Sequence, residues 1–167
     1  MKAFSIMVTA LLITGCDSPK NDDVLERLPY WKWAHYESKD EITDIKSSSA
    51  VLKSGPVMDG NTSPVEMHFR CLDGKFDFYL SWNRYVEDDP LVDTRIDNDA
   101  HQSSKWEVST DRKSTFNLLT TSVFLDRLAA SKTYLARVST ATGNITAKFD
   151  TSQVRKETKS IREECKI

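Results

Sequence analysis

The stretch VEMHFRCLDGKFDFYLSW, residues 65–82, decides the fold class. Apolar side chains alternate with polar ones on both sides of an Asp-Gly pair, which is typical of two half-buried strands joined by a tight turn. The apolar series consists of Val65, Met67, Phe69, Cys71, Phe76, Phe78, Leu80 and Trp82. The pattern predicts an antiparallel hairpin whose apolar face lies against a core.

Further short segments with turn residues between them extend this pattern. We expect strands at 49–54, 91–97, 105–109 and 114–119, and a second hairpin from 133–139 and 144–150. Helical spacing predicts a helix at 122–132, capped by Ser122, with Val123, Phe124, Arg127 and Leu128 on one face. It also predicts helices at 22–28 and in the tail 151–167. The fold class is therefore mainly β (α+β): an antiparallel β-sandwich or partly closed barrel with one or two helices in the C-terminal half.

The first residues, MKAFSIMVTALLITGC, indicate a secretory signal. Lys2 precedes an apolar run that is too short to span a bilayer and ends in ITGC, which resembles a bacterial lipobox. We expect a lipoprotein signal peptide at 1–15, a lipidated Cys16 that opens a flexible tether at 16–23, and a single β-rich domain at 24–167. An ordinary signal peptide is the alternative. Asp17 resembles an inner-membrane retention signal, so we expect the periplasmic side of a bacterial membrane, with the inner membrane favoured.

The net charge and the number of cysteines limit the possible partners and the redox state of the protein. The net charge of −2 and the lack of a basic block argue against nucleic acid as a partner. With Cys16 lipidated, Cys71 and Cys165 remain, and two cysteines in an oxidising compartment are expected to form a disulfide. A reactive thiol at one of them is the alternative.

No sequence motif defines a catalytic or metal centre. The three histidines, His35, His68 and His101, lack a second ligand at metal-binding spacing, and we expect neither metal nor cofactor. The carboxylates near Pro90 are interpreted as a solvated acidic loop, with an acid–base site as the alternative; they are Glu87, Asp88, Asp89 and Asp93. The aromatic cluster is either core cover or a contact patch; it comprises Tyr30, Trp31, Trp33 and Tyr36.

The stretch TRIDNDAHQSSKWEVSTDRKSTF, residues 94–116, carries a more specific pattern. An Arg-x-Asp strand, a polar loop and Trp-x-x-Ser-x-Asp resemble the VasI/TagO-like family associated with type VI secretion. The matching positions are Arg95, Asp97, Trp106, Ser109, Asp111 and, further on, Arg137, Phe149 and Asp150. The two cysteines Cys71 and Cys165 also match, and the resemblance extends over about residues 24–165. It implies a periplasmic accessory lipoprotein.

The same residues also have structural interpretations. Trp106 alternates with Lys105 and Glu107 and is expected in the core, whereas Arg95 and Asp97 are expected on one strand face. Arg137 is expected to pair there with Asp97 or Asp111.

The leading functional hypothesis is a membrane-anchored envelope lipoprotein that acts as a noncatalytic accessory module and binds a protein partner, as the resemblance to type VI secretion proteins implies. The alternatives are a phage- or prophage-encoded lipoprotein that blocks superinfection, and an envelope hydrolase or inhibitor.

Overall fold

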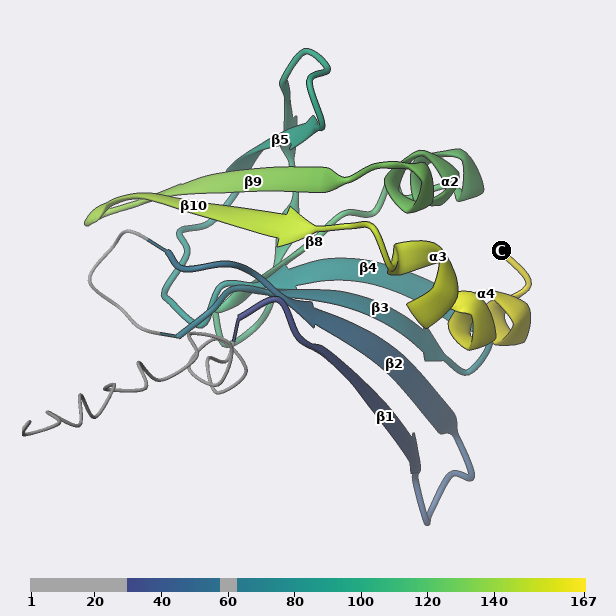
Figure 1. Ribbon diagram of the computed structural model, residues 1–167. Coiled ribbons are helices and arrows are strands. Elements are labelled where there is room, and N and C mark those ends of the chain that lie inside the picture. The colour runs from purple at the N-terminus through teal and green to yellow at the C-terminus, as the bar shows by residue number, and fades with distance from the viewer. Residues whose placement is uncertain (1–29, 58–62) are drawn as a thin grey trace, which may run out of the picture.

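The computed structural model describes residues 30–57 and 63–167, which form two antiparallel sheets packed face to face (Figure 1). The elements are β1 (Trp33–Lys39), β2 (Lys46–Lys53), β3 (Glu66–Leu72), β4 (Lys75–Ser81), β5 (Leu91–Ile96), β6 (Gln102–Lys105), β7 (Glu107–Val108), β8 (Ser114–Phe116), α2 (Ser122–Ala130), β9 (Thr133–Thr140), β10 (Gly143–Asp150), α3 (Val154–Glu157) and α4 (Lys159–Cys165). One sheet has the order β1-β2-β3-β4-β8-β7 and the other β10-β9-β5-β6. The described chain thus has the predicted fold class, a sandwich-like α+β fold.

Several sequence predictions lie outside the described residues. They are the signal peptide at 1–15, Cys16, Asp17, the tether at 16–23 and the helix at 22–28. Within the described ranges, no helix has the length and apolar character needed to cross a membrane.

The hairpin β3–β4 confirms the prediction from residues 65–82. Phe69 lies directly opposite Phe78, and both point into the core. The turn between the strands places Asp73 at φ 51° and Gly74 at φ 72°. Two successive positive φ values are typical of the type I′ turn that fits the twist of a hairpin, and glycine adopts one without strain.

The core lies between the two sheets. Phe78 of the six-stranded sheet meets Tyr134 of the four-stranded sheet edge-on, with ring centroids 6.3 Å apart. Trp82 is fully buried, and its indole Nε1 donates a 3.0 Å hydrogen bond to the hydroxyl of Thr115. The indole ring is therefore buried while its N–H group keeps a hydrogen-bond partner, as is usual for a tryptophan in a core.

The chain passes from one sheet to the other at Trp106. The strand predicted at 105–109 is divided there, because β6 belongs to the four-stranded sheet and β7 to the six-stranded one. The Trp106 amide donates to the carbonyl of Pro90 at 3.1 Å, and its side chain is only 4% exposed. Trp106 is a core residue, as predicted, and it forms the corner between the sheets.

The N-cap residue of helix α2 lies one position earlier than predicted. Thr121 is the cap, with extended backbone and a hydroxyl that accepts a hydrogen bond from the Phe124 amide, whereas Ser122 is already helical. The predicted face is also partly wrong, since Val123 is 67% exposed and the buried residues are Leu125, Leu128 and Ala129. These three follow the i, i+3, i+4 spacing that faces a core.

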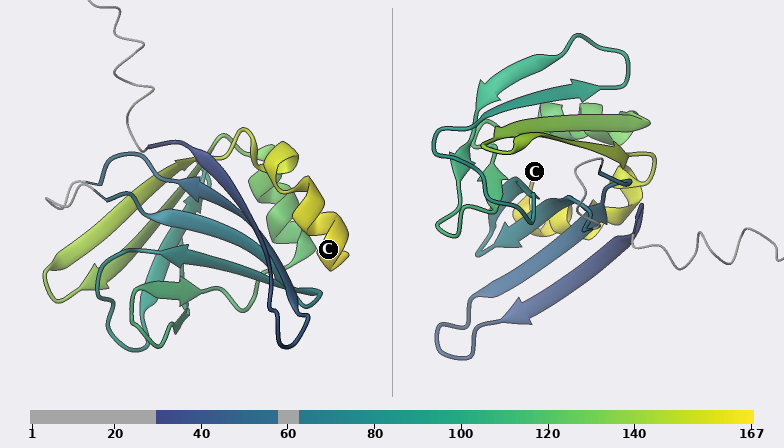
Figure 2. Two further views of the ribbon diagram at one scale, coloured as in Figure 1. Left: turned by 90° about the horizontal axis from the view of Figure 1, so that it is seen from below. Right: turned by 90° about the vertical axis from the view of Figure 1, so that its left-hand side faces the viewer.

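The predicted tail helix is interrupted at Thr158. The Thr158 hydroxyl donates to the carbonyl of Val154 at 2.7 Å, at the junction of α3 and α4. Val154 and Ile161 are buried, and Cys165 forms the expected disulfide with Cys71 at a Cα–Cα distance of 5.7 Å. All three described helices gather at one end of the sandwich (Figure 2).

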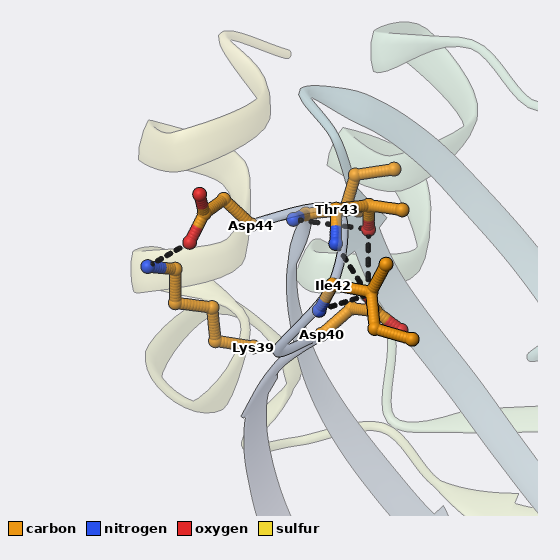
Figure 3. A network of polar contacts seen from close by, with 6 residues as sticks. Lys39, Asp40, Ile42, Thr43 and Asp44 are labelled. Atoms are coloured by element: carbon orange, nitrogen blue, oxygen red, sulfur yellow. Dashed lines mark hydrogen bonds and ion pairs between the residues drawn. The ribbon is translucent and has the colours of Figure 1, made fainter.

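The β1–β2 hairpin extends away from the rest of the sandwich, and its tip has a fixed conformation (Figures 1 and 3). One carboxylate oxygen of Asp40 accepts hydrogen bonds from the Ile42 amide, the Thr43 amide and the Thr43 hydroxyl at 2.7–3.0 Å. These bonds hold the pKa of Asp40 below its ordinary value. Lys39 and Asp44 form an ion pair across the hairpin at 2.5 Å. The turn presents the Ile42 side chain, 93% exposed, to solvent.

Candidate functional site

The outer face of the four-stranded sheet brings together the largest group of predicted site residues. In β5, β9 and β10, alternate residues Val92, Val138 and Ile145 fill the core, so that their neighbours point outward. One outward row runs from Asp93 through Arg137 to Thr146, and the next from Arg95 through Leu135 to Lys148. We call this surface the cationic sheet face; it consists of Asp93, Arg95, His101, Leu135, Arg137, Thr146 and Lys148.

A shallow hollow of about 160 Å³ lies within the cationic sheet face. Leu135 and Ala136 contribute apolar surface to it, whereas Arg95, Arg137 and His101 contribute nitrogen donors. The hollow therefore combines apolar surface with the guanidinium of Arg95, unpaired within the described ranges, and the Arg137–Asp93 ion pair, which suits an acidic group attached to an apolar body.

Arg137 is fixed by Asp93, not by Asp97 or Asp111 as predicted. Its Nε and Nη2 atoms donate to Asp93 Oδ2 at 3.0 and 2.6 Å, because the register places the two residues directly opposite each other. The other carboxylate oxygen accepts from the Ser103 hydroxyl. The Ser103 bond, followed by Arg137, holds the pKa of Asp93 below its ordinary value.

Arg95 and Lys148 differ from Arg137 in having no ion-pair partner among residues 30–57 and 63–167. Both are exposed, and they flank the half-buried Leu135 on neighbouring strands. Two strand spacings separate them, which is about 10 Å. The outer face of this sheet thus presents two unneutralised cations on either side of an apolar side chain.

Asp97 lies beside this face but has a structural role. It follows the end of β5 at φ 45°, so it leaves the strand and does not share a face with Arg95, which corrects the prediction. Its Oδ1 atom accepts hydrogen bonds from the amides of Lys132 and Thr133 at 3.0 and 2.8 Å. These bonds hold the pKa of Asp97 below its ordinary value and join the end of β5 to the start of β9.

Ser109 and Asp111 lie in the turn between β7 and β8. The Ser109 hydroxyl donates to Asp111 Oδ1 at 2.5 Å and accepts from the amides of Lys113 and Ser114. This network orders a turn in which Arg112 has φ 56°. Of the motif residues, the structure brings Arg95 and Arg137 together on the cationic sheet face, and Ser109 and Asp111 together in this turn.

The acidic residues near Pro90 mostly face cations. Arg112 donates to Asp88 at 2.8 Å and to the Tyr85 hydroxyl at 2.7 Å, and Lys105 lies 3.9 Å from Asp89. Glu87 is exposed. Asp88 and Asp89 thus each face a cation and not another carboxylate. This arrangement favours the interpretation as a structural loop over an acid–base site.

The histidines occupy three separate environments. His35 lies in β1, and its ring nitrogen Nε2 lies 3.1 Å from the carbonyl of Glu157. His68 stacks on Tyr79 at 4.4 Å on the outer face of the six-stranded sheet, and His101 lines the hollow. In the part of the chain that the structure describes, no group of three or more His, Cys, Asp or Glu residues is placed to hold a metal ion.

The aromatic cluster contains both kinds of residue that were predicted, one that covers the core and others that are exposed. Trp33 stacks on Phe69 at 5.9 Å and covers the core. Trp31 and Tyr36 are 44% and 59% exposed. The ring of Trp31 lies above Gly55, where a Cβ atom would come within 2.2 Å of it, so this close approach requires glycine.

Sequence reasoning missed Leu135 and Lys148 as members of the site. The signal was present, because the hairpin predicted at 133–150 places them on the same face as Arg137 once its turn is fixed. Comparisons with known proteins found no matching family model, no matching curated protein and no matching solved structure. The resemblance at 94–116 stays a prediction.

Proposed function

We propose that this protein is a lipid-anchored lipoprotein of the bacterial envelope that binds an acidic protein partner through its cationic sheet face and catalyses no reaction. The observation that carries the proposal is the pair of unneutralised cations, Arg95 and Lys148, on either side of Leu135. An acidic segment with an apolar side chain would complement this arrangement in charge and shape.

Order in the part of the face beside these two cations supports a binding role. Arg137 is held by two hydrogen bonds to Asp93, and Asp93 by Ser103, so these side chains are ordered before any partner arrives. Ordered side chains lower the entropic cost of association. The type VI secretion apparatus is the proposed setting, on the motif resemblance at 94–116.

The anchor is proposed from ITGC at residues 13–16. Replacement of Cys16 by Ser removes the sulfur that would carry the diacylglycerol, and several acyl chains are needed for firm attachment. We expect the C16S variant in the soluble periplasmic fraction and the wild type in the membrane fraction. Membrane retention of C16S equal to that of the wild type would contradict the anchor.

The partner is tested by crosslinking in membranes followed by affinity purification. The variant R95A/K148A should lose a crosslinked protein that the wild type retains. The matched control K75A/K159A also removes two exposed positive charges, but from outside the cationic sheet face, and should retain it. Equal recovery with all three proteins would refute this face as the binding surface.

A further inference from the structure

The connection between β8 and α2, together with the first turn of α2, exposes three aliphatic side chains close together in the sequence. Leu118 is 65% exposed, Leu119 80% and Val123 67%. We call them the aliphatic loop. Single exposed leucines are common on protein surfaces, but a group of them indicates a surface that contacts something apolar.

The aliphatic loop is held in place by hydrogen bonds. The Asn117 amide donates to the carbonyl of Phe78 in β4 at 3.1 Å, and the Asn117 side-chain oxygen accepts from the Leu119 amide at 3.0 Å. The Asn117 carbonyl accepts from the Thr120 hydroxyl at 2.9 Å, and Thr121 then caps α2. Leu118 and Leu119 are therefore presented by a turn that is joined to the sheet.

The loop itself is uncharged, and the charges next to it on α2, Asp126 and Arg127 one helical turn after Val123, are both neutralised by ion pairs with Arg162 and Asp99. Residues 114–125 contain no Lys, Arg, His, Asp or Glu. The hairpin tip provides a contrast within the same molecule, since its exposed Ile42 is surrounded in the sequence by Asp40, Glu41 and Asp44 (Figure 3). Burying a carboxylate in a bilayer is costly, whereas burying an uncharged aliphatic turn is favourable.

We infer that the aliphatic loop inserts into the interfacial region of the lipid bilayer. The inference rests on the proposed lipid anchor. Cys16 lies 14 positions before Tyr30, the first described residue, and even a fully extended chain of that length spans only about 50 Å. The anchor keeps the loop at a high effective concentration near the membrane, so a weak apolar contact suffices to orient the domain.

The test uses the full lipidated protein in phosphatidylcholine vesicles with brominated acyl chains, which quench tryptophan fluorescence on contact. The variant L119W places a tryptophan in the aliphatic loop. The matched control I42W places one on a second ordered, exposed turn, at the tip of the β1–β2 hairpin. The four native tryptophans are subtracted by measuring the wild type in the same vesicles.

Brominated chains should quench the added fluorescence of L119W by about half or more, as expected for a side chain at the acyl boundary, and leave that of I42W unchanged. Raised salt should not alter the result, because no charge takes part. Equal quenching of the two variants, or none, would overturn the inference while leaving the anchor intact. Failure of the wild type to float with the vesicles would overturn both the anchor and the inference.

Discussion

Removal of the Cys71–Cys165 disulfide is the perturbation whose effect follows most directly from the structure. The bridge joins positions 94 residues apart and ties α4 to β3. A crosslink of that span lowers the entropy of the unfolded chain by an amount worth about 4.7 kcal/mol at 25 °C. Cys71 is also fully buried beside Ala50 and Ile161, so replacing it by Ala costs about 1 kcal/mol more in lost packing.

The double variant C71A/C165A should therefore be about 4–6 kcal/mol less stable than the oxidised wild type. Urea unfolding followed by tryptophan fluorescence is the assay. A slope of about 2 kcal/mol per M of urea converts the loss to a fall of about 2–3 M in the midpoint. Reductant should lower the wild-type midpoint close to that of the variant and leave the variant unchanged.

Hydrogen exchange gives a local readout of the same change. Without the bridge, α4 still packs Ile161 against Ala50 and still accepts the hydrogen bond from Ser48 at Glu164, but it is no longer covalently tied to β3. The backbone amides of α4 should therefore lose protection from exchange before those of β3, which stay paired within the sheet. A loss of stability below about 1 kcal/mol would refute the chain-entropy argument.

Two further predictions concern a buried hydrogen bond and a carboxylate. Trp82→Phe leaves the buried Thr115 hydroxyl without its indole donor and should cost about 1–3 kcal/mol in urea unfolding; the pair W82F/T115V should recover part of that loss, and no recovery would contradict the hydrogen-bond explanation. The His68 ring, whose Nε2 lies 3.4 Å from the Glu66 carboxylate, holds the pKa of Glu66 below its ordinary 4.5. A lowered folded-state pKa stabilises the fold above that ordinary value, and the stabilisation is lost as pH falls through the folded-state pKa. The Tm of E66Q should therefore fall less than that of the wild type when the pH is lowered from 6 to 3. An equal fall in Tm for both proteins would exclude a stabilising role of the Glu66 carboxylate.

Local patterns in the sequence were enough to predict two of the hairpins, β3–β4 and β9–β10, but not β1–β2, whose first strand was missed. In residues 65–82 and 133–150 the strands that pair are neighbours in the chain, and alternation with a turn signal specifies both face and partner. The disulfide followed from counting cysteines once Cys16 was assigned to lipid.

Features that depend on distant residues could not be predicted in this way. The change of sheet at Trp106 depends on β6 pairing with β5 while β7 pairs with β8. The partner of Arg137 depends on the register between β5 and β9, which no local pattern encodes. The same register creates the cationic sheet face. That Leu135 and Lys148 belong to one site with Arg95 could therefore be recognised only from the assembled sheet.

Site-specific photocrosslinking in intact cells tests the central proposal most directly. A photoreactive phenylalanine analogue at Leu135 stands between Arg95 and Lys148, and one at the exposed Tyr36 of β1 serves as the control. We expect a discrete adduct with an envelope protein from Leu135 that the added substitutions R95E/K148E abolish, and no such adduct from Tyr36. The same adducts from both positions, or an adduct from Leu135 that survives charge reversal, would contradict the proposal.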